Sequence, residues 1–89
     1  MYSSSVVIKN KTGLHMRPAA EFIRCAASFQ SQVTLIRCDD GRRGNAKSAL
    51  SLLKMELVQG TEIRLEAEGP DEQKAVETLI GLINSGFDE

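Results

Sequence analysis

The residues best suited to chemistry in this 89-residue chain lie together in one short segment, Gly13–Ala20. It contains His15, which is the only histidine, and Arg17 follows two positions later. A neutral imidazole is a nucleophile that can carry a transferred group. A guanidinium pairs with phosphate or carboxylate oxygens through its planar fork. The segment therefore predicts a site where His15 accepts a phosphoryl group beside an anion-binding arginine.

The residues after His15 carry the signals of a helix start. Pro18 is tolerated in the first turn of a helix, where its missing N–H has no intrahelical partner. We expect a helix over Met16–Ala27, whose positive N-terminal end and free N–H groups favour an anion beside His15. Helical spacing predicts a buried stripe of Ala19, Phe22, Ile23 and Ala26. On spacing alone, a surface or capping histidine without chemistry is the commoner alternative.

Three segments of the chain are similar to one protein family. The run Gly13-Leu14-His15-Met16-Arg17-Pro18-Ala19 closely resembles the active-site signature of HPr, the histidine phosphocarrier family of the bacterial phosphoenolpyruvate:sugar phosphotransferase system. The segment 45–48 resembles the regulatory serine region of that family, and 60–72 resembles its last strand and the start of its last helix. The resemblance covers nearly the whole chain.

The resemblance implies a function in a phosphoryl relay. Enzyme I, charged by phosphoenolpyruvate, would phosphorylate Nδ1 of His15, and the group would pass to a sugar-specific IIA domain. The protein would be a carrier in a relay and not an enzyme with turnover of its own. One alternative is a regulatory paralogue, in a nitrogen-type or dihydroxyacetone-kinase relay. Another is an interaction module, in which phosphorylation of Ser48 by a serine kinase creates a binding surface for a transcription factor.

The resemblance also assigns roles to residues around His15. Arg17 matches the active-site arginine of the family, and Pro18 matches its proline. Thr12 falls where the family has a polar residue near the phosphoryl group, and its hydroxyl could donate a hydrogen bond there. Ser48 matches the serine that a kinase phosphorylates in many members. The alternatives are a plain loop residue for Thr12 and an ordinary helix N-cap for Ser48.

An apolar surface near His15 is a second expected feature of the site. An exposed patch of this kind would be a docking surface for partner proteins. The alternative is that one of its two leucines belongs to the core. Lys9 and Lys11, with Arg17, would add positive charge that attracts acidic partners. The patch is predicted to comprise Met16, Ala20, Leu50 and Leu53.

Composition excludes several other classes of protein. The net charge is −1, with 11 basic and 12 acidic residues, which argues against a nucleic-acid binder. No apolar run approaches the about 20 residues that span a membrane, and the first residues do not form a signal peptide. Cys25 and Cys38 match no zinc motif, so we expect neither metal nor cofactor. We expect one domain, residues 1–89, that is monomeric and cytoplasmic.

The remaining elements follow from periodicity and turn signals. They predict the order βαββαβα and the class α+β. The resemblance implies an HPr-like open-faced β-sandwich, with a four-stranded antiparallel sheet and three helices on one face. Two departures from the family are a slightly longer hairpin before Ser48 and Glu56 in place of a glycine. The expected strands are Ser5–Lys9, Gln32–Arg37, Arg42–Gly44 and Thr61–Glu68. The other expected helices are Ala49–Met55 and a last one that starts with Gly69-Pro70-Asp71-Glu72 and stops at Gly86.

Overall fold

The computed structural model describes residues 1–88 and has the predicted order of elements. The strands are β1 (Tyr2–Val7), β2 (Gln32–Arg37), β3 (Arg43–Asn45) and β4 (Glu62–Glu68). The helices are α1 (Met16–Ala27), α2 (Ala49–Met55) and α3 (Glu72–Asn84), and a short 3-10 turn, η1 (Gly86–Asp88), follows α3. The predicted ranges of α1, β2 and α2 are confirmed without a shift.

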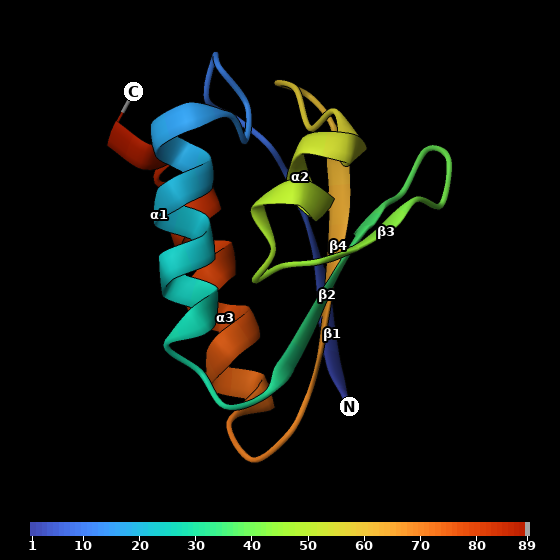
Figure 1. Cartoon of the computed structure of the whole chain (residues 1–89), viewed down its shortest axis with the longest axis vertical. Helices are drawn as coiled ribbons and strands as arrows, with labels where there is room; N and C mark the ends of the chain where they lie inside the picture. Colours follow the sequence, from blue (N-terminus) through green and yellow to red (C-terminus); the bar gives the residue numbers. More distant parts are fainter. Residues whose placement is uncertain (89) are drawn as a thin grey trace.

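The strands form one four-stranded antiparallel sheet in the order β1-β4-β2-β3. The helices cover one face of this sheet and leave the other face open (Figure 1). The open-faced α+β architecture is therefore confirmed. β4 lies between β1 and β2, and its residues alternate between the two faces. Ile63, Leu65 and Ala67 are buried under the helices, whereas Glu62 and Arg64 are exposed on the open face, as the period of two predicts.

Three of the four strands, β1, β3 and β4, differ from their predicted ranges. β1 begins at Tyr2 and not at Ser5, because Ser3 and Ser4 pair with Glu66 and Leu65 of β4. It also ends at Val7 and not at Lys9, because its pairing with β4 ends at Val7. These serines lack the apolar pattern of a strand, so only the neighbouring strand holds them extended. β3 is shifted one residue later, to Arg43–Asn45, because its pairing with β2 begins at Arg43. β4 begins one residue later than expected.

The predicted buried stripe of α1 is only partly correct. Phe22 and Ala26 are fully buried, and Pro18, which periodicity did not select, is also buried. Ala19 and Ile23 are half-buried because they face a hollow that lies between α1 and α2. The stripe thus contributes to the core through Phe22 and Ala26 and to the wall of the hollow through Ala19 and Ile23.

A network of hydrogen bonds joins the start of α3 to the loop before β2. The carboxylate of Asp71, the N-cap residue of α3, accepts hydrogen bonds of 2.9 Å from the backbone N–H groups of Gln30 and Ser31. The hydroxyl of Ser31 also donates to it. Gly69 permits this approach, since a Cβ there would lie 2.6 Å from Oγ of Ser31. At the other end of α3, Gly86 follows the C-cap with φ of 69°, as the predicted stop requires.

Candidate functional site

His15 occupies the N-cap position of α1, directly before the first helical residue. Its backbone is extended, with φ of −128° and ψ of 154°, and its side chain makes no capping hydrogen bond. The imidazole is half-buried. The next residue, Met16, has a left-handed backbone with φ of 54°, which is uncommon for any residue other than glycine. The chain thus turns sharply at the start of α1, and this turn carries His15 and Met16.

The loop before His15 rests on the segment that follows α2. The N–H of Leu14 donates a hydrogen bond of 2.8 Å to the carbonyl of Leu57, and both side chains are buried. Gly13 has φ of 68°, and a Cβ on it would lie only 2.2 Å from that same carbonyl oxygen. A glycine is therefore required for the His15 loop to lie this close to the chain after α2.

A buried asparagine also braces this loop. Asn10 is 3% exposed, and its Nδ2 donates to the carbonyl of Gly13 at 2.7 Å and to Oγ1 of Thr12 at 3.3 Å. The structure thus brings Thr12 into the loop of His15, where its hydroxyl oxygen accepts a hydrogen bond. Sequence reasoning missed Asn10. Its signal is the preference of asparagine for turns, where its amide bonds to the backbone nearby.

Arg17 is anchored at the C-terminal end of the chain. Its guanidinium forms an ion pair with Glu21, one turn further along α1. Its Nη2 also donates a hydrogen bond of 3.0 Å to the main-chain carbonyl of Phe87. Phe87 is buried and has φ of 55°. The sequence predicted Arg17 as an anion-binding residue. The i,i+4 spacing to Glu21 was a signal for the ion pair that sequence reasoning missed, whereas nothing in the sequence pointed to Phe87.

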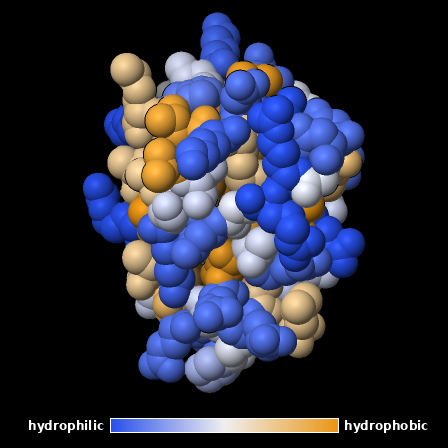
Figure 2. All heavy atoms as spheres, turned by 45° about the vertical axis from the view of Figure 1, so that its right-hand side comes forward, coloured by the Kyte–Doolittle hydropathy of each residue, from blue (hydrophilic) through white to orange (hydrophobic). Residues whose placement is uncertain are grey.

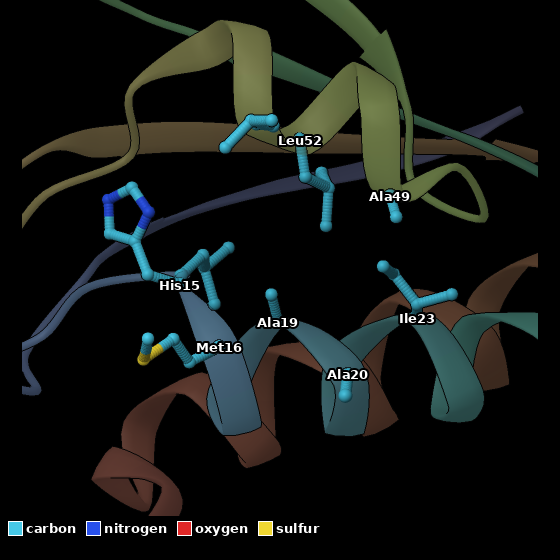
Figure 3. Close-up of a pocket in the computed structure, with 9 residues that line it drawn as sticks. His15, Met16, Ala19, Ala20, Ile23, Ala49 and Leu52 are labelled. Carbon is cyan, nitrogen blue, oxygen red and sulfur yellow. The ribbon is translucent and has the colours of Figure 1, made fainter.

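An apolar hollow lies between α1 and α2, next to His15. Its volume is about 280 Å³. Figure 3 shows that His15 projects from the start of α1 toward α2, while Ala19 and Ile23 line the α1 side and Leu52 faces them from α2. Small side chains at Ala19 and Ala49 leave the space open. The full lining is Leu14, His15, Met16, Ala19, Ala20, Ile23, Ala49, Leu52 and Leu53.

The four residues predicted as an apolar patch are all exposed. Met16 is 90% exposed, Leu50 61% and Leu53 64%, and Ala20 is also exposed. The buried residues of α2 are Leu52 and Met55, so neither of the two predicted leucines belongs to the core. Figure 2 shows a largely hydrophilic face on which the largest group of hydrophobic atoms lies at the upper left, with smaller groups elsewhere. Exposed apolar side chains in such a group are typical of docking surfaces.

Ser48 is the N-cap residue of α2. Its Oγ accepts a hydrogen bond of 3.3 Å from the backbone N–H of Ser51. An N-cap serine satisfies one of the N–H groups that lack a partner in the first turn of a helix. The structure therefore places Ser48 at the N-terminal end of the helix that carries Leu50 and Leu53. Lys47, directly before it, donates from Nζ to the carbonyl of Phe29 at 2.8 Å.

Metal binding and membrane spanning find no support in the described part of the chain. Within residues 1–88, no group of three or more histidine, cysteine, aspartate or glutamate residues could hold a metal ion. No helix in the same range is long and apolar enough to cross a membrane. Cys25 and Cys38 are both unpaired thiols, and partial burial raises the pKa of Cys25.

Lys9 and Lys11 are exposed on the loop that leads to His15.

Comparison with known proteins identifies the family. The family model described as the PTS HPr component phosphorylation site matches residues 2–85. The phosphocarrier protein NPr of Escherichia coli (strain K12) is 41% identical over 85 residues, which cover 96% of this chain and 93% of that protein. The phosphocarrier protein HPr of Haemophilus influenzae is 45% identical over 83 residues, which cover 93% of this chain and 95% of that protein.

Solved structures give the same result. The crystal structure of HPr-C-His from Thermoanaerobacter tengcongensis is 43% identical and superposes with a TM-score of 0.95, covering 100% of this chain and 98% of that one. HPr from the same organism has also been crystallised as a dimer. These matches span the His15 loop, the sheet and all the helices. The chain belongs to the HPr family, the phosphocarrier proteins of the phosphotransferase system.

Proposed function

We propose that Nδ1 of His15 accepts a phosphoryl group from enzyme I of the phosphoenolpyruvate:sugar phosphotransferase system and that the chain passes it to a sugar-specific IIA domain. One observation carries the proposal. The His15 imidazole stands at the N-cap of α1 without a capping hydrogen bond and borders the apolar hollow. A nucleophile is thus available at a helix end where a partner protein can reach it.

The proposed transfer needs only the neutral imidazole. With its proton on Nε2, His15 attacks phosphorus through Nδ1. The new N–P bond forms while the bond from phosphorus to the donor group of enzyme I breaks. The reverse sequence of events delivers the group to the acceptor. No third molecule is consumed, so the chain acts as a carrier and not as a turnover enzyme.

The start of α1 suits the charge of a phosphorylated histidine. The first turn contains no acidic residue, and its free N–H groups together with the helix dipole stabilise an anion. Arg17, in the same turn, can add a charge-assisted hydrogen bond. Pro18 is buried in the same turn. Because proline has no N–H to donate, Pro18 contributes to the site through packing and not through a hydrogen bond. Positioning and electrostatics thus supply most of the effect.

Docking in the proposed relay uses the apolar patch of Met16, Ala20, Leu50 and Leu53. Met16, Ala20 and Leu53 line the hollow and Leu50 is exposed on the same helix as Leu53, so a partner that covers the patch also excludes water from His15. Exposed Lys9 and Lys11 favour a partner with an acidic rim.

We assign residues 1–89 to one cytoplasmic domain that acts as a monomer.

Two branches of the family fit the same site. Relatives named NPr and HPr match at 41% and 45% identity, so identity alone does not choose between a sugar-transport carrier and a regulatory paralogue. The carrier chemistry at His15 is common to both. Acceptor identity separates them: a panel of purified IIA domains, each offered the phosphorylated chain, shows which type receives the group.

The test is phosphoryl transfer in a defined mixture. The chain is incubated with enzyme I and labelled phosphoenolpyruvate, and His15→Ala is the control. We expect one label per chain, lost in acid and absent from His15→Ala, because phosphohistidine is acid-labile and His15 is the only histidine. Label that resists acid, or that persists in His15→Ala, would contradict the proposal.

A further inference from the structure

The last turn of α2 is held by two arginines of the β2–β3 hairpin. Arg37 donates from Nη1 to the carbonyl of Met55 at 2.8 Å and to that of Glu56 at 3.1 Å. Arg42 donates from Nη1 to the carbonyl of Lys54 at 3.3 Å. The last carbonyls of a helix have no partner within the helix, and positive charge is favourable there. The hairpin therefore caps the C-terminus of α2.

The two arginines are fixed within the hairpin itself. The Nε of Arg37 bonds to Asp39 at 2.8 Å, and the side chain of Arg37 is only 17% exposed. The Nε of Arg42 lies 2.9 Å from Asp40. Backbone hydrogen bonds of 2.8 Å close the hairpin, from Arg37 to Arg42 and from Gly41 to Arg37. The guanidinium of Arg37 is thus a rigid support and not a mobile surface charge.

α2 needs such support for two reasons. It has seven residues, and a helix this short is not stable through its own hydrogen bonds. Its C-cap, Glu56, has a left-handed backbone with φ of 53° and ψ of 58°, a conformation that glycine adopts far more readily. Arg37 binds the carbonyl of this same residue, so it opposes unwinding of the helix where the backbone is least favourable.

The same hairpin also sets the distance between α2 and the sheet. A Cβ on Gly44, in β3, would lie 2.8 Å from Sδ of Met55 and 3.3 Å from Cβ of Ser51. The helix therefore packs directly on the backbone of β3. Contact at Gly44 and the arginine bonds together fix both the distance and the orientation of α2.

We propose that Arg37, assisted by Arg42, positions the docking surface: by capping α2 it holds Leu53 in place beside His15 and keeps Leu50 exposed on the same helix. This inference rests on the function proposed above. Arg37 does not touch the transferred group, so its removal acts on the encounter with a partner and not on the chemical step. The KM for the chain as substrate of enzyme I should rise while kcat stays nearly constant.

The test compares steady-state labelling by enzyme I for the wild type, Arg37→Gln, Arg42→Gln and Arg43→Gln. Arg43 is the matched control, because it is 61% exposed and pairs with Glu66 on the open face of the sheet. We expect KM to rise about fivefold for Arg37→Gln and less for Arg42→Gln, which makes only one hydrogen bond to α2, of 3.3 Å, besides its ion pair with Asp40. Arg43→Gln, with the same loss of charge, should match the wild type. The KM of Arg37→Lys should lie between that of the wild type and that of Arg37→Gln.

Amide hydrogen exchange gives a readout that does not depend on the relay. Exchange of the α2 amides should accelerate in Arg37→Gln and not in Arg43→Gln. Unchanged KM in Arg37→Gln, with the wild type labelled normally, would overturn the positioning role alone. Absence of label in the wild type would overturn the proposed function, and this inference with it. If Arg37→Gln does not fold, Arg37→Lys decides: a raised KM supports the inference, and the wild-type KM overturns it.

Discussion

Arg17 donates a hydrogen bond of 3.0 Å to the main-chain carbonyl of Phe87, which lies 70 residues later in the chain. On its other side the guanidinium pairs with Glu21. The start of α1 and the C-terminal turn are thus joined through the side chain that the proposed function assigns to the phosphoryl group. A phosphoryl group on His15 must compete with a carbonyl and a carboxylate for the donors of Arg17.

Arg17 provides the first prediction. Arg17→Lys keeps the charge but loses the planar fork, so labelling of His15 by enzyme I should slow about tenfold, which corresponds to about 1.4 kcal/mol. Arg17→Glu should slow it further, because a carboxylate repels the phosphoryl group. The fold should persist in both variants, since the side chain of Arg17 is 55% exposed. Circular dichroism checks the fold, and a normal labelling rate in Arg17→Glu would remove Arg17 from the site.

Ser48 provides the second prediction. A phosphate there adds a charge of about −1.5 to −2 at the end of α2, beside Leu50 and Leu53, and should weaken docking to an acidic partner. Ser48→Asp, a partial mimic, should therefore be labelled more slowly by enzyme I. Its thermal midpoint should equal or exceed that of the wild type, because aspartate is also a good N-cap.

Ser48→Ala separates capping from regulation. It removes the acceptor for the N–H of Ser51 and should lower stability by about 1 kcal/mol. Its labelling rate should stay at the wild-type value. Equal labelling rates in the wild type, Ser48→Ala and Ser48→Asp would leave Ser48 as a structural cap only.

Gly13 provides the third prediction. Gly13→Ala forces a side chain to a φ of 68° and places Cβ 2.2 Å from the carbonyl of Leu57, so the His15 loop must move. Gly60→Ala is the matched control, because φ is 89° there and nothing lies within 4 Å of its Cβ. Stability should fall by about 1 kcal/mol in the control and by more in Gly13→Ala.

Labelling of these two glycine variants tests whether the loop positions His15. Gly13→Ala should be labelled more slowly at a temperature where it remains folded, whereas Gly60→Ala should match the wild type. Denaturant unfolding gives the stabilities, and the initial rate with enzyme I gives the labelling. Identical labelling rates in the two variants would show that the contact between the His15 loop and Leu57 has no influence on the reactivity of His15.

Asp71 provides the fourth prediction, which concerns pH. The hydroxyl of Ser31, followed by the backbone N–H groups of Gln30 and Ser31, lowers the pKa of Asp71 from 3.8 to about 2. A depressed pKa means that the folded state favours the carboxylate. The resulting stability is fully present above the unfolded value and is lost as the pH falls through about 2. Acid should therefore weaken the junction between α3 and the loop before β2.

The measurement is the thermal midpoint of the wild type and Asp71→Asn between pH 7 and pH 2. Asp71→Asn should be less stable at neutral pH, and the difference should shrink steadily below the unfolded value of 3.8. Ser31→Ala, which keeps the carboxylate but removes its main donor, should show a smaller difference. A difference between wild type and Asp71→Asn that stays constant over the whole range would contradict the assigned cause.

Local patterns in the sequence predicted the helices and the strand β2. α1, α2 and β2 have strong periodicity and clear end signals, such as Pro18 in the first turn of α1 and the N-cap Ser48, so their ranges are confirmed. The range of β1 was wrong because Ser3 and Ser4 have no strand pattern of their own. Their extended conformation comes from pairing with β4, a contact between segments about 60 residues apart that no local pattern contains.

The sequence by itself determined the candidate chemistry: one histidine at a helix start, an arginine two residues later, and the resemblance to HPr, all within a few adjacent residues. Only the tertiary structure decided what surrounds them. Phe87, which lies 70 residues later in the chain, binds Arg17, and α2 forms the second wall of the hollow. Arg37, which caps α2, was also visible only in the fold. The physical reason is that hydrogen bonds and packing join residues by distance in space, whereas motifs and periodicity record only neighbours along the chain.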